Sequence, residues 1–180
     1  MVRHLIITIA AMLMLCGSAH ATGLTLWGLT EQVSSVDSDN AITGRIGYDL
    51  SVGDNGGLEP FIGSVWHPQD STPQVIVVGA VQHFPDLLDP NGLIPYIPEL
   101  FTTLINEDVA IRPYAGAQCT INLVDEDAGF IGAIAGVAIK LTPEATSELI
   151  FEASYDNTFS DLNDVPDNRL KGYMGFRIPF

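Results

Sequence analysis

The sequence predicts an all-β fold, an antiparallel up-and-down transmembrane β-barrel of eight strands. Three observations predict it: a final segment that alternates strictly between apolar and polar residues, an apolar amino-terminal segment typical of exported proteins, and basic residues confined to one face of the predicted strands. No later apolar stretch is long enough for a spanning helix, so a chain that enters a membrane must do so as a closed sheet.

The final segment, residues 168–180, gives the clearest pattern. Its apolar face ends on an aromatic residue and consists of Leu170, Gly172, Met174, Phe176, Ile178 and Phe180. Its other face carries Arg169, Lys171, Tyr173 and Arg177. Because one face is apolar up to its last residue and the other is largely cationic, this strand suits a wall between lipid and a polar lumen.

The amino terminus indicates export. A short basic start precedes an apolar run at 5–15, and a small-residue exit ends at Ala21. This pattern predicts a signal peptide at 1–21, cleaved after Ala21, followed by a barrel domain at 22–180. Lipidation at Cys16 is the weaker alternative, because a lipidated cysteine follows a small residue and this one follows a leucine.

Period-2 alternation between turn residues predicts the eight strands. Their ranges are 24–33, 41–52, 57–67, 73–83, 109–123, 129–141, 145–156 and 168–180. The first, third and fourth are ambiguous in orientation, whereas the other five alternate cleanly. Residues 85–108 are too long for a turn, and they predict a short helix near 98–106 within a loop that covers the barrel mouth, in preference to a plug or a membrane anchor. A hidden pair of strands there would raise the count to ten.

The net charge of the chain limits the classes of partner that it can bind. Loss of Arg3 with the signal peptide changes the formal net charge from −15 to −16, which argues against nucleic acid as a partner. The remaining basic residues all fall on the polar face of a predicted strand. There they avoid the roughly 2–4 kcal/mol that a charge costs near the middle of a lipid-facing surface. A soluble β-sandwich would also be charged outside, but it would carry Lys and Arg in its loops.

The polar faces predict a charge network in the lumen. Its members are Arg45, Asp49, Arg112, Lys140, Glu148, Glu152, Asp156, Arg169, Lys171 and Arg177. In the last hairpin, one register makes three cross-strand pairs: Glu148 with Arg177, Glu152 with Tyr173, and Asp156 with Arg169. Paired charges are the expected filling of a narrow eight-stranded lumen, so we expect a closed or barely conducting barrel rather than a transport path.

Other candidate sites are weak, and we predict no catalytic, cofactor-binding or metal-ligating residues. His67 near Asp70 and Ser71 is a faint likeness to an acyl-transfer site, but three polar residues in a loop are a common accident. His83 is interpreted as a membrane-interface residue. The acidic loop residues are interpreted as solvated charge rather than calcium sites, with cation bridging to lipopolysaccharide as a secondary hypothesis. They include Asp125, Glu126, Asp127, Asp161, Asp164 and Asp167.

Aromatic residues near the predicted strand ends predict two interfacial girdles. An even strand count with both ends of the barrel domain in the periplasm gives their orientation. The extracellular girdle would contain Trp66, Phe130 and Tyr155, and the periplasmic girdle would contain Trp27, Phe84 and Phe180.

Three stretches, together with the signal peptide, carry a family resemblance: Arg112–Ala117, Gly132–Val137 and Gly175–Phe180. They resemble the small eight-stranded outer-membrane barrels of Gram-negative bacteria, the OmpX and OmpA transmembrane-domain type. The resemblance covers most of the chain and implies an outer-membrane location, contact with membrane lipid and lipopolysaccharide, and roles in adhesion, host contact and envelope integrity. It also implies insertion by the barrel-assembly machinery, which reads a terminal aromatic strand such as the one with Phe176, Ile178 and Phe180.

We therefore expect a monomeric outer-membrane barrel without enzyme activity and without a cofactor, in a structural, adhesive or surface-interaction role. Three alternatives stay open: a small porin-like channel, a lipid A-modifying acyl enzyme, and a soluble lipocalin-like barrel whose apolar faces point inward. The long 85–108 segment departs from the short periplasmic turns of the resembled family.

Overall fold

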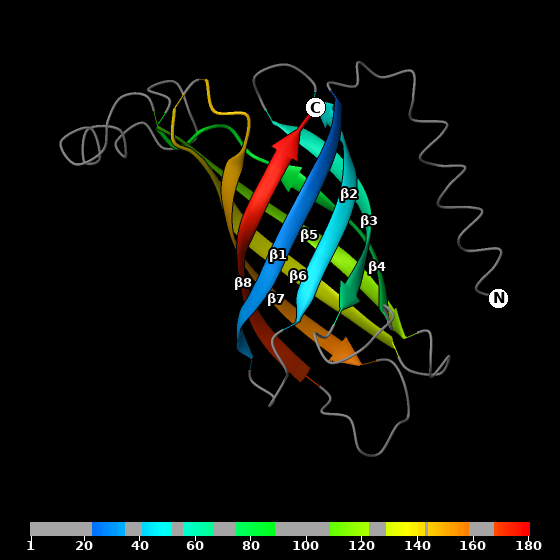
Figure 1. Cartoon of the computed structure of the whole chain (residues 1–180). Helices are drawn as coiled ribbons and strands as arrows, with labels where there is room; N and C mark the ends of the chain where they lie inside the picture. Colours follow the sequence, from blue (N-terminus) through cyan, green and yellow to red (C-terminus); the bar gives the residue numbers. More distant parts are fainter. Residues whose placement is uncertain are drawn as a thin grey trace.

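The computed structural model is an eight-stranded barrel closed by hydrogen bonds between its first and last strands (Figure 1). It describes residues 23–34, 41–51, 56–66, 75–88, 109–122, 129–142, 144–158 and 168–180. The predicted fold class is confirmed. The helix predicted near 98–106 and the signal peptide lie outside the described residues. Within the described part of the chain, no helix is long and apolar enough to cross a membrane.

All eight strands are antiparallel to their neighbours, and each neighbour in the sheet is also a neighbour in sequence. They are β1 (Gly23–Ser34), β2 (Ile42–Ser51), β3 (Gly57–Trp66), β4 (Val75–His83), β5 (Ala110–Asn122), β6 (Gly129–Lys140), β7 (Glu148–Thr158) and β8 (Asn168–Pro179). The predicted ranges agree with these bounds to within three residues, the largest difference being at the start of β7. Closure leaves no unpaired strand edge, which removes the usual template for edge-to-edge aggregation.

The register of the last hairpin is the one predicted from the sequence. Three pairs of Cα partners define it: Glu148 with Arg177, Glu152 with Tyr173, and Asp156 with Arg169. On the other side of β8, the pairing with β1 shifts between Glu31 and Val33, which marks a β-bulge in the seam that closes the barrel.

The barrel has two distinct ends. Gly23 and Phe180 lie at one of them, where the backbone N–H of Phe180 donates to the carbonyl oxygen of Leu24 at 2.8 Å. We call this the terminal end. At the opposite end β1 finishes at Ser34 and β8 begins at Asn168. We call that the loop end, and Figure 1 shows β1 and β8 side by side between the two.

The outer wall is apolar. Large exposed hydrophobic side chains occur on all strands except β4 and β5, among them Leu26, Ile46, Ile62, Ile131, Phe151, Leu170 and Phe176. The structure also resolves the three ambiguous strands: Trp27 and Leu29 of β1, Glu59 and Phe61 of β3, and Val77, Val81 and His83 of β4 are buried inside. In β4 both faces are largely apolar, so alternation carried no information about which face is inward.

The predicted girdles are wrong at two positions. Trp27 is 3% exposed and lies in the lumen, not at the membrane surface. Phe130 also lies on the inward parity of β6, where the guanidinium carbon of Arg169 sits 4.2 Å from the centre of its ring. Trp66, Tyr155 and Phe180 are exposed on the outer face as predicted.

Ring packing inside the barrel depends on a glycine. Tyr114 of β5 is buried and its ring occupies the space beside Gly136 of β6, its neighbour in register. A Cβ added at Gly136 would lie 2.5 Å from the Tyr114 ring and 2.6 Å from the backbone oxygen of Phe151. Because a backbone atom forms one side of this space, the site cannot yield by moving a flexible side chain alone.

We expect Gly136→Ala to lower the free energy of unfolding by about 1–3 kcal/mol, the usual cost of forcing extra volume into a packed interior. Gly28→Ala is the matched control, because Gly28 faces outward and an added Cβ there has no neighbour within 4 Å. The measurement is the urea midpoint of the purified protein in detergent micelles. Equal midpoints for the two variants would contradict the close packing of Tyr114.

Candidate functional site

The lumen is the candidate functional site, because the buried charged side chains gather there. Seven of them are at most 5% exposed: Glu31, Arg45, Glu59, Glu148, Glu152, Asp156 and Arg177. Strand parity explains their position, since each lies on the inward face of its strand. A buried charge is costly unless it is paired and hydrogen-bonded, so the contacts of these groups decide what the lumen can do.

Arg177 of β8 is the centre of the charges near the terminal end. Its Nη1 donates to Glu148 Oε2 at 2.7 Å, and its Nη2 donates to Asp49 Oδ2 at 2.9 Å. Its Nε and Nη2 both donate to Glu59 Oε2, at 3.0 and 2.9 Å. Three carboxylates from β2, β3 and β7 therefore converge on one guanidinium. Arg112 of β5 adds a second cation through its ion pair with Glu148.

Glu59 of β3 was not recognised from the sequence as a lumen residue. Its carboxylate accepts further hydrogen bonds in addition to its ion pair with Arg177. The Trp27 Nε1 donates to its Oε1 at 2.6 Å, and the Thr25 hydroxyl donates to the same oxygen. The Nε2 of His83 lies 2.8 Å from its Oε2. His83 is thus a lumen residue, and its assignment to the membrane interface is wrong. The one signal for Glu59 was a carboxylate between Leu58 and Pro60 in a strand of uncertain orientation.

Arg45 and Glu152 form a bridge across the middle of the lumen. The guanidinium of Arg45 makes two bonds to the carboxylate, Nη1 to Oε2 and Nη2 to Oε1, both at 2.7 Å. Because Arg45 is in β2 and Glu152 in β7, which are not neighbours in the sheet, the pair spans the barrel. Tyr114 donates its hydroxyl to Glu152 at 3.2 Å, and the Arg45 guanidinium lies 4.7 Å from the centre of the Phe61 ring.

Near the loop end the polar contacts are longer than those that Arg177 makes near the terminal end. Lys171 Nζ is 3.2 Å from Glu31 Oε2, and Asp156 accepts a hydrogen bond from Gln118 Nε2 at 3.1 Å. Asp156 and Arg169 are opposite in register, but they do not form an ion pair among the described contacts.

The predicted network is thus brought together only in part. Lys140, the last residue of β6, has no ion pair within the part of the chain that the structure describes. The partners across the lumen, Arg45 with Glu152 and Arg177 with Asp49, are not the strand neighbours that the hairpin register alone would pair. Glu31, Glu59 and His83 were missed.

The charges balance at each level of the barrel. The terminal-end half holds three acidic residues, Asp49, Glu59 and Glu148, and three basic ones, Arg112, Lys140 and Arg177. The middle holds Glu152 with Arg45, and the loop-end half holds Glu31 and Asp156 with Arg169 and Lys171. Among the charged residues of the eight strands, neither sign is in excess at any of these three levels.

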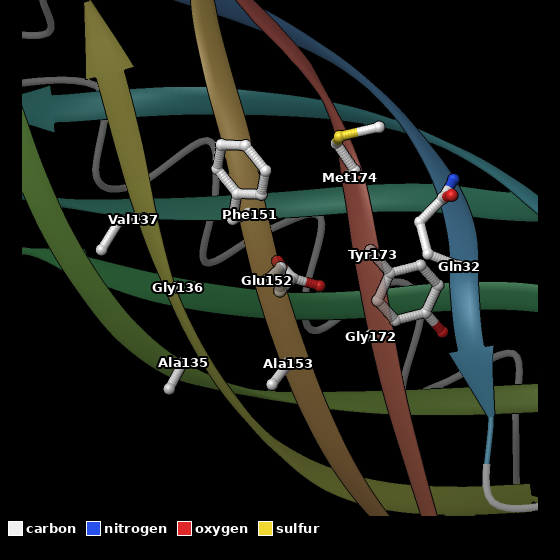
Figure 2. Close-up of a pocket in the computed structure, with 10 residues that line it drawn as sticks. All are labelled: Gln32, Ala135, Gly136, Val137, Phe151, Glu152, Ala153, Gly172, Tyr173 and Met174. Atoms are coloured by element: carbon white, nitrogen blue, oxygen red, sulfur yellow. The ribbon is translucent and has the colours of Figure 1, made fainter.

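The outer wall carries a shallow groove over β6, β7, β8 and β1 (Figure 2). Figure 2 shows Phe151 and Met174 on one side of it and Gln32 on another. The small residues Ala153 and Gly172 are opposite in register and form part of its floor. The groove is largely apolar; Glu152 and Tyr173 also line it, but both residues are buried, and the Glu152 carboxylate is bonded to Arg45 in the lumen.

The described residues do not form any of the other sites that were considered from the sequence. Among them, no group of three or more His, Cys, Asp or Glu side chains could hold a metal ion. His67, Asp70 and Ser71 lie outside the described residues, as do the acidic loop residues. Cys119 is a free thiol on β5.

Several solved structures are similar to this chain. Neisserial surface protein A (NspA) is 19% identical, with 89% of this chain and 99% of that chain covered and a TM-score of 0.48. The N-terminal β-barrel domain of Pseudomonas aeruginosa OprF is 14% identical, with coverage of 88% and 98% and a TM-score of 0.43. Ail, the attachment invasion locus protein of Yersinia pestis, is 11% identical, with coverage of 87% and 95% and a TM-score of 0.39.

At such identities the likeness concerns the fold. No protein-family model matches the chain, and no curated protein sequence matches it.

Proposed function

We propose that this chain is an integral outer-membrane β-barrel with a closed lumen and a structural, adhesive or surface-interaction role. One observation carries the proposal: the closed sheet is apolar on its outside and ion-paired on its inside. A soluble barrel has the reverse arrangement, because water must wet its outer face. The lipocalin-like alternative requires apolar side chains inside and polar ones outside, and the exposed Ile46, Ile62 and Phe176 contradict it.

In this proposal the terminal end faces the periplasm and the loop end faces the medium. The apolar wall contacts membrane lipid, and the loop end meets lipopolysaccharide. Phe176, Ile178 and Phe180 are all exposed on the outer face of the last strand, where the barrel-assembly machinery could read them. The protein would act as a monomer after cleavage of its signal peptide behind Ala21.

The closed lumen distinguishes this proposal from a small porin-like channel. The Arg177 cluster and the Arg45–Glu152 bridge cross the interior at two levels. The buried rings of Trp27, His83 and Tyr114 pack against one another, with centroid separations of 5.5 to 6.3 Å. Ion pairs buried in this way are held by several hydrogen bonds each, so thermal motion of a single side chain does not open a continuous water path.

The location is tested by expressing the chain with its amino-terminal segment in a Gram-negative host and fractionating the envelope. We expect recovery in the outer membrane and a gel migration that changes on boiling, because a closed sheet has no edge from which detergent can unravel it. A boiled aliquot of the same sample is the control. Recovery in the soluble periplasmic fraction would overturn the proposal.

The closed lumen is tested separately by planar-bilayer recording of the purified protein. We expect no large, stable conductance, because the ion pairs block the lumen at two levels. Detergent buffer without protein is the control for leaks. Long-lived openings of uniform size would favour the porin-like alternative.

A further inference from the structure

The groove in the outer wall has a floor of small residues and a raised apolar edge. Ala135, Ala153 and Gly172 are successive partners in register on β6, β7 and β8, and they form the floor. Along one side, Phe151 and Met174 are also partners in register and project from the wall, each 43% exposed. The groove has a volume of about 650 Å³, within the range of about 300–1,000 Å³ that is usual for small-molecule sites.

A polar side chain lies at one end of this floor. The register of β1 with β8 shifts between Glu31 and Val33, so Gln32 is the extra residue of the β-bulge. Bulges often re-aim a side chain beside a functional site. Gln32 is exposed on the outer face and lines the groove, and Figure 2 shows it at the opposite end of the floor from Ala135.

Hydrogen bonds at the seam fix the orientation of the Gln32 amide. Its Nε2 donates to Thr30 Oγ1 at 2.7 Å, and the Thr30 hydroxyl donates to the backbone oxygen of Met174 at 3.0 Å. Because that hydroxyl has a single hydrogen, it can only accept from Gln32, so the amide nitrogen must face it. The side-chain oxygen of Gln32, Oε1, is left as an acceptor, and none of the described residues donates to it.

The floor slopes from the loop end into the wall. Gln32 is two residues from the loop-end limit of β1 at Ser34, whereas Ala135 is six residues from the loop-end limit of β6 at Gly129. The tilt of the strands in a closed barrel produces this slope. In the proposed orientation the loop end faces the medium. The polar end of the groove therefore lies near the outer membrane surface, and the apolar end lies deeper in the hydrocarbon.

The groove fits an acyl chain that carries a hydrogen-bond donor near its root. The apolar trough matches hydrocarbon, and the Oε1 of Gln32 requires a donor because an unpaired polar atom is costly where water is excluded. The ester linkages of a glycerophospholipid only accept hydrogen bonds. Lipid A, the anchor of lipopolysaccharide, has amide-linked and hydroxylated acyl chains, which supply N–H and O–H donors at that position.

A second copy of this chain fits the groove less well. Ten residues line it, two of which, Glu152 and Tyr173, are buried. A stable protein interface involves roughly 20–30 residues on each side. The size of the groove therefore favours a single lipid chain.

We propose that this groove binds one acyl chain of lipid A, with the Oε1 of Gln32 accepting a hydrogen bond from the amide or hydroxyl at the root of the chain. This inference deepens the proposed function and rests on it, because the groove meets lipid only if the apolar wall lies in the membrane.

Met174 supplies a reporter inside the groove. The chain has four methionines, and the other three, Met1, Met12 and Met14, lie in the predicted signal peptide. Protein recovered from the outer membrane after ¹³C-methyl labelling of methionine should therefore give one methionine signal, which Met174→Leu would remove. The signal is followed by NMR in deuterated detergent during titration with lipid A, and separately with phosphatidylethanolamine.

We expect lipid A to shift the Met174 methyl signal to saturation and to give a magnetisation transfer from acyl methylene groups to that methyl. Ala153→Leu should abolish this response, because the larger side chain fills the floor. Ala117→Leu is the matched control, since it makes the same substitution on the outward face of β5, away from the groove. Equal responses of the two variants would overturn the site.

Gln32→Leu examines the polar end. It should weaken lipid A binding about fivefold, the usual effect of one net hydrogen bond, and leave phosphatidylethanolamine binding unchanged. The unmodified protein should bind phosphatidylethanolamine more weakly than lipid A by a similar factor. Equal affinities for the two lipids, or no effect of Gln32→Leu, would overturn the assignment to lipid A.

The remaining outcomes separate this inference from the proposed function. No response to lipid A in a protein that still migrates as a heat-modifiable outer-membrane barrel would overturn the groove alone. Recovery of the protein in the soluble fraction would overturn both. A Met174 signal that shifts with protein concentration and not with lipid would place a second copy in the groove and overturn the lipid site.

Discussion

Arg177→Met is expected to destabilise the barrel more than any other single substitution of a lumen charge. The variant keeps most of the side-chain volume but removes the cation that Asp49, Glu59 and Glu148 share. Three carboxylates then lose their shared cation, although Glu148 keeps its ion pair with Arg112 and Glu59 keeps its contact with His83. Breaking a buried ion pair by removing one partner costs about 3–5 kcal/mol, and here one cation serves three partners.

The measurement is urea unfolding of the protein in lipid vesicles, followed by tryptophan fluorescence. Trp27 is a local probe, because the Arg177 guanidinium carbon lies 5.7 Å from the centre of its ring. Arg112→Met is the matched control: among the described residues Arg112 forms one ion pair, with Glu148, and its side chain is 38% exposed, so solvent screens its loss. If both variants unfold at the same urea concentration, Arg177 is not the centre of the cluster.

A double variant examines whether the cluster acts as a unit. Glu59→Gln removes one of the carboxylates that Arg177 neutralises, so the combination of Glu59→Gln and Arg177→Met should lose less stability than the sum of the two single changes. Additive losses would mean that the Glu59–Arg177 contact contributes no coupling free energy.

Ile46→Arg is expected to give the second large effect, and it tests the outer wall. Ile46 is 51% exposed at the middle of β2, and its register partners Leu26 and Ile62 are also exposed apolar residues. An arginine near the bilayer midplane of a membrane barrel costs about 2–4 kcal/mol, falling to about 0–1 kcal/mol near the interface. The variant should therefore unfold at a clearly lower urea concentration in lipid vesicles.

Ile42→Arg is the control for depth. It makes the same substitution on the same face of the same strand, but Ile42 is the first residue of β2 at the loop end. We expect it to unfold close to the unmodified protein. On a water-facing surface the two arginines would behave alike, so equal and small effects would argue that no lipid surrounds the wall.

The order and pairing of the strands were predictable because they follow from alternation and turn residues. In β7 and β8 the outward face is apolar and most charged residues lie on the inward face, so the register that joins Glu148 to Arg177 followed from sequence alone. In β3 and β4 the pattern is incomplete: Pro60 interrupts one strand, and valines occupy both faces of the other. Glu59 and His83 were therefore not assigned to the lumen.

The contacts across the lumen could not be predicted, because alternation defines a face and not a partner on the opposite wall. Arg45 meets Glu152 because the tilt and stagger of the strands bring β2 and β7 to one level, and these are properties of the closed barrel. Trp27 was misplaced for a related reason. Its neighbours Leu26 and Gly28 are also uncharged, so nothing local distinguishes a ring in the lumen from one at a membrane surface.

Because the charges within the strands balance, the net charge of this protein comes from residues outside the strands. The strands contain six acidic and six basic residues, so sixteen of the 22 acidic residues of the chain, and none of its basic residues apart from Arg3, lie between or outside the strands. Exposed charges are screened over about 8 Å at physiological ionic strength, whereas buried pairs are screened far less. Salt should therefore weaken the long-range attraction or repulsion between this protein and other charged molecules. The buried ion pairs that hold its interior together should respond little to salt.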